Sequence, residues 1–269
     1  MSGPTLMLLH GFMGEPSSWD DVIAALPSAR RVIRPALLGH RGGPPADASS
    51  SWDAEVSRLA AIVRIEARPE SRGVLLIGYS LGARLALAVA LSARTCVTRL
   101  VLVSGHAGLE HAADRAERCE SDDRLARSIT ADGLTVFVDA WESKPLFESQ
   151  RVLAPGVRAR HRARRLGHEP ASLAASLSAL SKGRMPWLEP LLAALDVDVT
   201  LMVGGRDAAA CSSAQQMGSL LPRARVLRMP NAGHDLCLER PDAVARAIEG
   251  EFVLGEPHES GIRPIEMNE

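Results

Sequence analysis

A serine between two glycines constrains the fold of this chain more than any other feature. The segment Leu75–Leu91 reads LLIGYSLGARLALAVAL, so an apolar run enters the pentapeptide Gly78–Gly82 and an Ala/Leu-rich run leaves it. This placement predicts a buried strand, a turn that carries Ser80, and then a helix. Such a turn is tight and strained, and glycine permits the close backbone approach on both sides of the serine. The segment therefore predicts an exposed serine nucleophile at a strand-to-helix junction.

Alternating runs of strand and helix length continue this pattern along the chain. Short apolar runs predict buried strands over Thr5–Leu9, Arg30–Leu38, Gly73–Gly78, Val97–Ser104, Val197–Val203 and Arg225–Met229. In the second of these runs, Pro35 marks the exit of the strand. Helical spacing predicts one helix that begins after a cap at Ser51. It predicts further helices over Leu81–Ala93, Ser212–Leu221 and Pro241–Phe252. Strands that alternate with helices predict the α/β class, with a mostly parallel central sheet and helices on both of its faces.

The alternation stops between residues 105 and 190, where we find helical patterns and no convincing strand. Glu110–Ile129 and Pro170–Ser181 predict helices, and Gly133–Phe147 is expected to be mostly helical. We therefore predict an α/β core formed by residues 1–104 and 191–254, with residues 105–190 inserted in it as a helical cap. The polar residues 255–269 are expected to form a frayed, flexible tail.

Composition and charge argue against several classes of function. The formal net charge of the 269 residues is −1, so no excess of charge indicates nucleic acid or an anionic membrane. No apolar run approaches about 18 residues, and the opening MSGPTLMLLHGF is typical of a first strand rather than of a signal peptide. The four cysteines form no CxxC pair, which argues against a zinc site and fits a reducing cytosol. We therefore expect a cytoplasmic protein without metal or cofactor, and no pattern indicates its oligomeric state.

Arginine carries nearly all of the positive charge, because Lys144 and Lys182 are the only lysines. Codon bias is the simplest interpretation, although the guanidinium fork also matches a carboxylate. The run Arg151–His168 holds six arginines and no acid. One interpretation is a cationic rim that attracts a polyanionic substrate. The favoured interpretation for most of these residues is a solvated helix face.

A serine nucleophile requires a base, and the base requires an acid that orients it. Asp207 follows the apolar strand in LMVGGRDAAA, and His234 lies in the loop MPNAGHDLCLERP after the next strand. The order Ser80, Asp207, His234 is that of a serine triad on an α/β sheet, so we predict these three as the catalytic residues. An alternative for Asp207 is a plain helix N-cap.

His10-Gly11-Phe12 ends the first predicted strand. In a site of this kind, that loop and the residue after the nucleophile each supply a backbone N–H to an oxyanion hole. We therefore predict that the amides of Phe12 and Leu81 form this hole. Packing of the Phe12 ring in the core is the alternative, and the two roles are compatible.

These residues resemble the α/β-hydrolase superfamily along the whole chain, and one branch fits best. That branch is the 2-succinyl-6-hydroxy-2,4-cyclohexadiene-1-carboxylate (SHCHC) synthases of menaquinone biosynthesis, the MenH type. The segments that carry the resemblance are LHGFMG at Leu9–Gly14, GYSLGARLAL at Gly78–Leu87, SGHAGL at Ser104–Leu109, FVDAWESKPLF at Phe137–Phe147 and NAGHDLCLERP at Asn231–Pro241. The tyrosine before the serine, the arginine four residues after it and the cap segments discriminate this branch from esterases.

The resemblance implies a lyase that expels pyruvate from a cyclohexene with an enolpyruvyl group, and whose arginines bind the carboxylates of this polycarboxylate substrate. Matched by position, Arg84 is the arginine of the elbow and Arg118 the first arginine of the cap. The second cap arginine is Arg165 or, equally, Arg164. The resemblance also places Tyr79 and Trp141 at the substrate.

Blander interpretations compete with the cap assignments, because Arg118 lies among acids that allow an i,i+3 surface pair and Trp141 is suited to cap packing. Two other functions also use this triad. One is a carboxylic-ester or C–C bond hydrolase, and the other is a ligand receptor that signals by closure of the cap. Arg84 favours the lyase, because an unpaired guanidinium near the floor of the site is costly unless a substrate carboxylate pairs with it.

Overall fold

A single twisted sheet forms the centre of the molecule. The computed structural model describes residues 3–27, 30–67, 72–251 and 263–264. The strands within these ranges are β1 (Thr5–Leu9), β2 (Val32–Ile33), β3 (Val74–Tyr79), β4 (Val97–Val103), β5 (Asp198–Gly204), β6 (Ala224–Met229) and β7 (Arg263–Pro264). They are ordered β2-β1-β3-β4-β5-β6-β7. Strands β1 to β6 are parallel and β7 pairs antiparallel with β6, so the predicted α/β class is confirmed.

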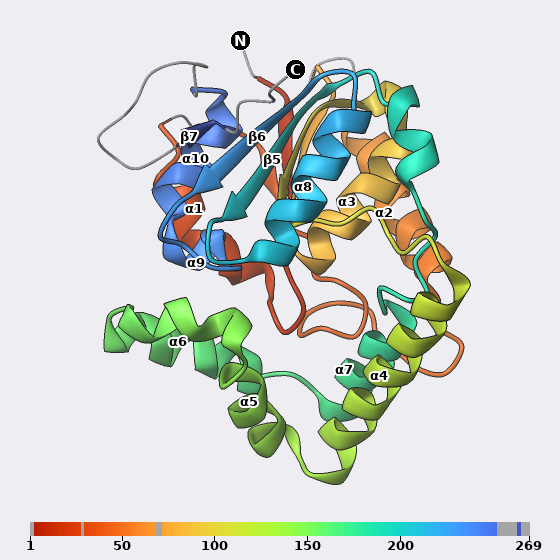
Figure 1. The fold of residues 1–269 in the computed structure, drawn as a ribbon, viewed down its shortest axis with the longest axis vertical. Coiled ribbons are helices and arrows are strands. Elements are labelled where there is room, and N and C mark those ends of the chain that lie inside the picture. The colour runs from red at the N-terminus through yellow and green to blue at the C-terminus, as the bar shows by residue number, and fades with distance from the viewer. Residues whose placement is uncertain (1–2, 28–29, 68–71, 252–262, 265–269) are drawn as a thin grey trace.

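Helices cover both faces of the sheet, as Figure 1 shows. The helices around the sheet are α1 (Asp20–Ala24), α2 (Trp52–Glu66), α3 (Leu81–Ser92), α8 (Ala208–Leu220), α9 (Leu236–Glu239) and α10 (Pro241–Glu249). Alternate residues of β1 enter different cores. Met7 packs with α2, α3 and α8, whereas Leu6 and Leu8 pack with α1 and α10. Burial on both faces explains why the strands are apolar throughout rather than alternating.

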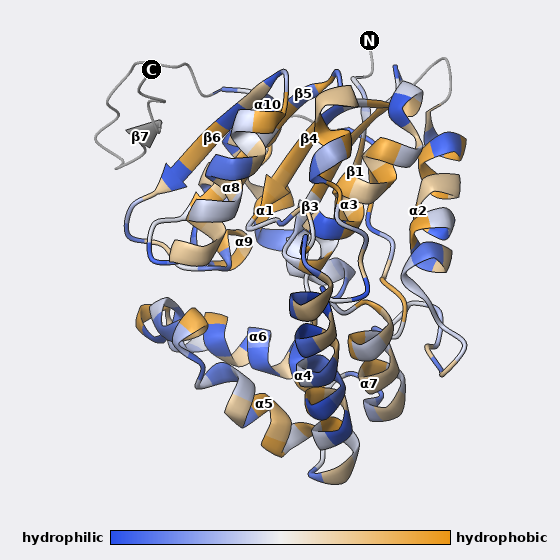
Figure 2. Ribbon diagram, turned by 45° about the vertical axis from the view of Figure 1, so that its right-hand side comes forward, coloured by the Kyte–Doolittle hydropathy of each residue, from blue (hydrophilic) through white to orange (hydrophobic). Residues whose placement is uncertain are grey.

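Residues 104–197, all of them described, contain no strand. Their helices are α4 (Ala112–Ala131), α5 (Leu134–Glu142), α6 (Pro155–Leu166) and α7 (Pro170–Ala179), and 3-10 turns lie at Pro145–Val152 and Glu189–Ala194. Figure 1 shows α4–α7 as a group beyond one end of the sheet. Their shared core includes Ile129, Phe137, Val138 and Leu173, while α4 is largely hydrophilic along its length (Figure 2). We refer to this group as the cap.

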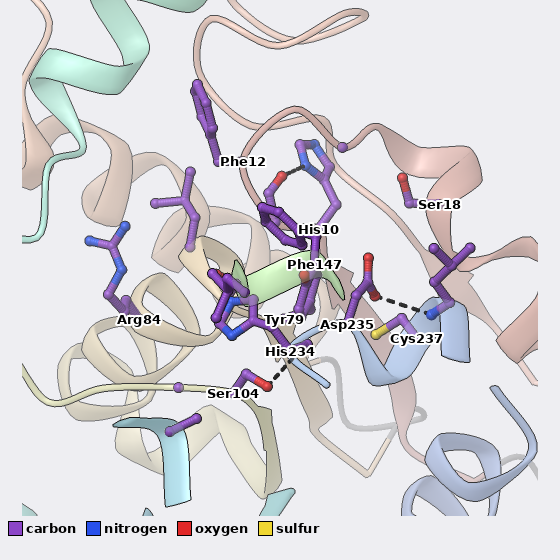
Figure 3. Close-up of a pocket in the computed structure, with 18 of the residues that line it drawn as sticks. His10, Phe12, Ser18, Tyr79, Arg84, Ser104, Phe147, His234, Asp235 and Cys237 are labelled. Carbon is purple, nitrogen blue, oxygen red and sulfur yellow. Dashed lines mark hydrogen bonds between the residues drawn. The ribbon is translucent and has the colours of Figure 1, made fainter. Parts of the chain in front are cut away.

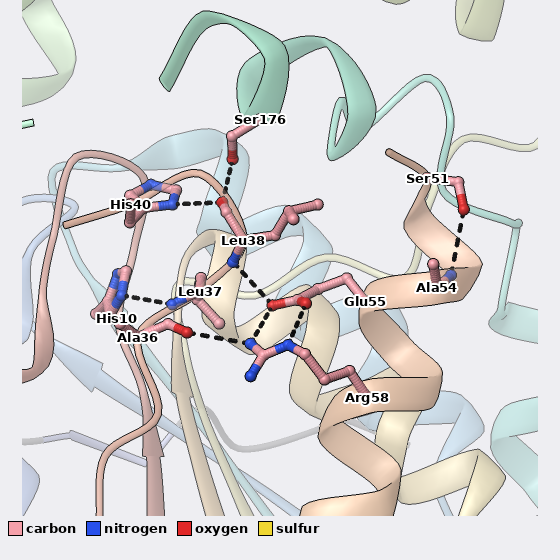
Figure 4. A network of polar contacts seen from close by, with 10 residues as sticks. All are labelled: His10, Ala36, Leu37, Leu38, His40, Ser51, Ala54, Glu55, Arg58 and Ser176. Atoms are coloured by element: carbon pink, nitrogen blue, oxygen red, sulfur yellow. Dashed lines mark hydrogen bonds and ion pairs between the residues drawn. The ribbon is translucent and has the colours of Figure 1, made fainter. Parts of the chain in front are cut away.

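The predicted strand over Arg30–Leu38 is wrong in extent, because only Val32–Ile33 pairs with β1. Pro35 has no N–H to donate, and the next amides are taken by side chains. Leu37 N–H donates to His10 Nε2 at 3.1 Å, and Leu38 N–H donates to Glu55 Oε1 at 3.0 Å (Figure 4). The segment is therefore a loop fixed by side chains and not by the sheet.

Two helices differ from their predicted bounds by three or four residues at one end. Helix α8 begins at Ala208 rather than Ser212, because Asp207 caps it. Helix α10 ends at Glu249, where Gly250 adopts a φ of 81° that terminates it. The predicted tail, 255–269, lies outside the described residues except for Arg263–Pro264. None of the described helices is long and apolar enough to cross a membrane.

Candidate active site

Ser80 occupies the turn between β3 and α3 in a conformation that L-residues rarely adopt, with φ 52° and ψ −108°. Two glycines make this turn sterically feasible. A Cβ on Gly78 would lie 2.3 Å from the carbonyl oxygen of Gly82, and a Cβ on Gly82 would lie 2.1 Å from the carbonyl oxygen of Leu9. The turn is thus packed against β1 as well as against itself. Backbone strain of this kind, on the order of 1–3 kcal/mol, is typical of functional sites.

A chain of hydrogen bonds joins Ser80 to two side chains from distant loops. Ser80 Oγ lies 2.9 Å from His234 Nε2, and His234 Nδ1 lies 2.5 Å from Asp207 Oδ2. The other oxygen of Asp207 accepts the Ala210 N–H at 3.0 Å, so the contact with the histidine and the helix cap use different atoms. Burial by itself would raise the pKa of Asp207, but the hydrogen bonds from His234 and from backbone amides bring it below its usual value. An ionised Asp207 orients the imidazole so that its Nε2 faces the serine.

The loop that carries His234 is itself held in place. Ser104 Oγ donates to the carbonyl oxygen of His234 at 2.7 Å (Figure 3), and Gly233 N–H donates to Glu239 Oε2 at 2.7 Å. The Tyr79 ring lies 5.6 Å from the imidazole, centroid to centroid. Burial, together with the nearby Asp235, raises the pKa of Tyr79 well above its ordinary value, so this phenol stays neutral. Tyr79 therefore supplies a neutral wall beside the base.

The two predicted oxyanion amides border the same cavity as Ser80. Leu81 is the first residue of α3, where an N–H has no acceptor within its own helix. Within the described ranges, neither the Phe12 nor the Leu81 amide donates to a protein acceptor. Both amides are therefore available to a ligand. Their role as an oxyanion hole stays a prediction.

Two buried histidines fix the loop that carries Phe12. His10 Nε2 accepts the Leu37 N–H, which leaves the proton on Nδ1, 2.8 Å from the carbonyl oxygen of Gly11. His40 Nε2 accepts the Met13 N–H at 3.2 Å in the same way. Burial lowers the pKa of His10 to about 4 and that of His40 well below the ordinary value, so both rings are neutral acceptors at pH 7.

A cavity of about 350 Å³ lies between the cap and the C-terminal ends of the strands. Figure 3 shows Arg84 and Ser18 on opposite sides of it, with Tyr79 and His234 between them. Its size is that of a small-molecule site. Trp141 stands in an aromatic cluster with Phe137, Phe147 and Phe12, at centroid distances of 5.6, 5.8 and 5.4 Å, and it also borders the cavity. Trp141 thus packs in the cap and contributes to the cavity wall.

Arg84 borders the cavity without a carboxylate partner among the described residues. Its Nη1 donates to the carbonyl oxygen of Leu180 at 3.1 Å, and its guanidinium lies 5.6 Å from the centroid of the Trp52 ring. Burial, followed by repulsion from Arg118, lowers the pKa of Arg84 to about 10, so it remains charged at pH 7. Its Nη1 also lies 3.9 Å from Met185 Sδ, a weak acceptor. A half-buried cation whose acceptors are all neutral is well placed to receive an anion.

The cap arginines also border the cavity, but they have protein partners. Arg118 Nε lies 2.8 Å from Asp122 Oδ2 at i,i+4, so the pair exists one residue beyond the expected i,i+3 spacing. Arg165 is 5% exposed, and its Nη1 lies 2.8 Å from Glu142 Oε1. Arg164 Nε donates to Ser17 Oγ at 3.1 Å. The structure therefore brings both alternatives, Arg164 and Arg165, to the cavity.

The arginine run is less solvated than its favoured interpretation implied. Arg162 forms ion pairs with Asp139 and Glu142, and Arg160 lies 3.5 Å from Asp21. These acids lie in other segments of the chain, so the sequence of the run itself does not indicate these ion pairs. The pairs tie α6 to α5 and to α1.

Sequence reasoning missed several residues on the cavity wall, namely Ser104, His106, His161, Lys182 and Asp235. Burial raises the pKa of Asp235 to about 6 and lowers that of His161 to about 3, so both groups titrate far from their usual ranges. Two of these residues could have been predicted to border the site. Asp235 is adjacent to His234 in the sequence, and Lys182 is one of only two lysines. No group of three or more metal-ligating side chains occurs in the described ranges.

Comparison with known proteins places this chain in a family. The family model described as "Alpha/beta hydrolase family" matches residues 6–247. The chain belongs to the α/β-hydrolase family. A solved structure described as MenH from S. aureus superposes on it with a TM-score of 0.86 and 28% identity, over 93% of each chain.

Two relatives assign this α/β hydrolase to a branch. A Bacillus subtilis (strain 168) protein, provisionally named as a 2-succinyl-6-hydroxy-2,4-cyclohexadiene-1-carboxylate synthase, is 36% identical over 90% of this chain and 88% of its own length. A protein from Enterobacter sp. (strain 638) with the same enzyme name is 31% identical over 91% of this chain and 90% of its own. The expected resemblance to the SHCHC synthases is thus confirmed.

Proposed function

We propose that this protein is a pyruvate-eliminating lyase of menaquinone biosynthesis, which forms SHCHC from the cyclohexene that carries an enolpyruvyl group. One observation carries the proposal. The hydrogen-bonded chain Ser80–His234–Asp207 opens into the same cavity as Arg84, a cation that has no carboxylate partner among the described residues. The triad supplies a base, and the unpaired guanidinium supplies a site for a substrate carboxylate. The names of the relatives agree with this chemistry.

The reaction proceeds by proton abstraction next to a ketone. His234 accepts the hydroxyl proton of Ser80, and Ser80 Oγ removes the acidic ring proton beside the succinyl ketone. The electrons of the broken C–H bond form an enolate. The enolate oxygen accepts hydrogen bonds from the backbone N–H groups of Phe12 and Leu81. Collapse of the enolate forms a new ring double bond and shifts the existing ring double bond toward the carbon that bears the enolpyruvyl group, whose C–O bond breaks, so the product is a conjugated ring diene. The leaving group takes up a proton and becomes pyruvate.

The cap and the arginines serve binding in this proposal. The substrate has carboxylates at several points, and each charge-assisted hydrogen bond contributes roughly 1.5–3 kcal/mol when well formed. Arg84 meets one carboxylate from the core side, while Arg118 and Arg165 extend from cap helices α4 and α6. Water is not a reactant, so a cavity closed by the cap protects the enolate from wasteful protonation.

Pyruvate release tests the proposal directly. We expect purified protein to release pyruvate from the enolpyruvyl cyclohexene substrate, with formation of the ring diene followed by its absorbance. Ser80→Ala is expected to reduce the rate by at least about 10³-fold, because the base is lost while the binding residues remain. Rapid hydrolysis of p-nitrophenyl acetate, with no pyruvate released from the cyclohexene, would instead establish the ester hydrolase.

A further inference from the structure

Ser104, directly after β4, adopts a backbone conformation that favours glycine. Its φ is 51°, and it is one of four non-glycine residues with positive φ in the ranges 3–27, 30–67, 72–251 and 263–264. Another of the four is Ser80 of the triad. The left-handed conformation destabilises an L-residue, because the Cβ crowds the following carbonyl oxygen. Such strain persists where the surrounding structure or a function requires it, so it points to a requirement for the Ser104 side chain.

Two consecutive residues at the end of β4 hold two segments of the triad. The Val103 carbonyl accepts the Ser80 N–H at 2.9 Å, and Ser104 Oγ donates to the His234 carbonyl at 2.7 Å. Ser80 and His234 lie 154 residues apart in the sequence, yet adjacent residues fix the backbone of both. The end of β4 is therefore a common support for the serine and the histidine.

The backbone of Ser104 also reaches the strand that leads to the acid of the triad. Its N–H donates at 2.8 Å to the carbonyl of Met202 in β5, the strand that ends shortly before Asp207. In the described part of the chain, no backbone N–H donates to the His234 carbonyl, so the hydrogen bond of that carbonyl depends on the Ser104 hydroxyl. Ser104 thus contacts β5 through its N–H and the histidine loop through its side chain.

The hydrogen bond from Ser104 acts on the residue whose ring serves as the base. Figure 3 shows Ser104 beside His234, joined to it by this bond. The imidazole Nε2 lies 2.9 Å from Ser80 Oγ, which is within reach for proton transfer. A displacement of about 1 Å at a reacting group can reduce a rate about 100-fold, so the backbone of His234 has to be held closely. Ser104 also borders the cavity, and direct contact between its hydroxyl and a substrate is the alternative role.

We infer that Ser104 is a positioning residue, which holds His234 in register with Ser80 from the end of β4. The inference rests on the proposed function for the role of His234 as the base, but not for the identity of the substrate. The hydroxyl of Ser104 takes no part in proton transfer, because its hydrogen bond goes to the backbone of the histidine and not to the ring. The backbone strain is retained because glycine, which would relieve it, has no hydroxyl.

Replacement by glycine and by alanine separates positioning from stability. Ser104→Gly removes the hydroxyl and relieves the strain, whereas Ser104→Ala removes the hydroxyl and keeps the strain. We expect the glycine variant to have the higher thermal midpoint of the two. In both variants kcat for pyruvate release should nevertheless fall about 10- to 100-fold, with KM within about twofold of the wild type.

Ser213→Ala is the matched control for both variants. Ser213 Oγ donates at 3.3 Å to the carbonyl of Gly105, the residue after Ser104, and Ser213 does not border the cavity. Its loss removes a hydrogen bond of the same kind from the same loop without a contact to the histidine. We expect kcat and KM of Ser213→Ala to stay within about twofold of the wild type.

A fluorophosphonate that labels Ser80 provides a test that does not depend on the substrate. Ser80 Oγ forms a bond to phosphorus, the phosphorus–fluorine bond breaks, fluoride leaves, and His234 takes up the hydroxyl proton. We expect the labelling rate to fall about 10- to 100-fold in both Ser104 variants and to stay within about twofold in Ser213→Ala. This result supports the inference even if the wild type releases no pyruvate and the proposed function fails.

Three results would overturn the inference. Unchanged kcat and labelling in Ser104→Gly would do so and leave the proposed function intact. A raised KM with unchanged kcat and labelling would assign the hydroxyl to substrate binding. Rates that fall in Ser104→Ala but not in Ser104→Gly would follow the thermal midpoints, and would assign Ser104 a purely structural role.

Discussion

Arg84 shows how one residue can narrow a reaction that the triad leaves open. Ser80, His234 and Asp207 suit ester hydrolysis and proton abstraction equally well. Arg84 donates to a single backbone carbonyl and stays charged at pH 7, although burial and Arg118 lower its pKa to about 10. A hydrolase of neutral esters gains nothing from such a group on the cavity wall, whereas an enzyme that binds a polycarboxylate does.

Substitution of Arg84 is therefore expected to affect the two chemistries unequally. Arg84→Ala should lower kcat/KM for pyruvate elimination by at least about 100-fold, the loss of a bidentate charge-assisted contact. Hydrolysis of p-nitrophenyl acetate, a neutral ester, should fall far less. Arg84→Lys keeps the charge but lacks the bidentate guanidinium, so its kcat/KM for pyruvate elimination should lie between those of the wild type and Arg84→Ala. Equal losses in both activities, measured on the same preparation, would assign Arg84 to packing.

At this scale the sequence predicts what a local pattern encodes. The motif around Ser80, and the positions of Asp207 and His234 after strands, placed three side chains that the structure joins by hydrogen bonds. Lys182 and Asp235 were missed because their importance comes from neighbours on other elements. Burial and the charges around a residue are tertiary properties, and no spacing rule contains them.

At the scale of elements, the elbow between β3 and α3 depends on contact with β1. Gly82 lies in the first turn of α3, and a side chain there would enter the backbone of Leu9. Strand β4, which follows α3 in the sequence, also holds the turn in place, since the carbonyl oxygen of its Val103 accepts the Ser80 N–H at 2.9 Å. The position of the serine is thus set by three neighbouring strands together.

A pair of glycine substitutions tests this dependence. Gly82→Ala is expected to destabilise the fold by about 3 kcal/mol or more, because the new Cβ meets backbone that cannot yield without moving β1. Gly156→Ala is the control, since a Cβ at Gly156 in α6 meets no atom within 4 Å and should stabilise the protein by about 0.5–1 kcal/mol. Urea unfolding of the two variants measures both changes, and equal stabilities would refute the packing argument.

The loop after β2 shows why the element boundaries were harder to predict. RRVIRPALL has the apolar content of a strand, but Glu55 and His10 take the amides that a strand would give to the sheet. Ser176 Oγ of α7 donates to the Leu38 carbonyl at 2.7 Å, which ties the loop to the cap (Figure 4). These partners lie from 17 to 138 residues away in sequence, so local periodicity cannot reveal them.

At the scale of the whole molecule, buried histidines join the core to the cap. His10 follows β1, His40 lies in the loop after β2, and His168 follows α6. Their rings stack edge to face, at centroid distances of 5.0 Å between His10 and His40 and 5.4 Å between His40 and His168. Burial lowers the pKa of all three, and each accepts a backbone N–H that a protonated ring cannot accept.

Acid should therefore destabilise this protein before carboxylates of ordinary pKa titrate; Asp235, whose pKa burial raises to about 6, is the exception. A histidine whose pKa is depressed in the folded state contributes stability that is complete above its unfolded value, near 6.5, and that is lost as the pH falls below it. The unfolded chain then binds protons that the folded chain excludes. Each such imidazole lowers the free energy of unfolding by about 1.4 kcal/mol per pH unit below 6.5, until the pH reaches its folded-state pKa. For His10 this pKa is about 4.

Thermal unfolding between pH 7 and pH 5 measures this loss, and we expect the midpoint to fall steeply over that interval. His40→Gln keeps a hydrogen-bonding side chain that does not titrate, so its midpoint should start lower at pH 7 but decline less on acidification. His111→Gln is the control, because His111 is exposed and should leave the slope as in the wild type. A His40→Gln slope identical to the wild type would show that the acid sensitivity arises outside this histidine cluster.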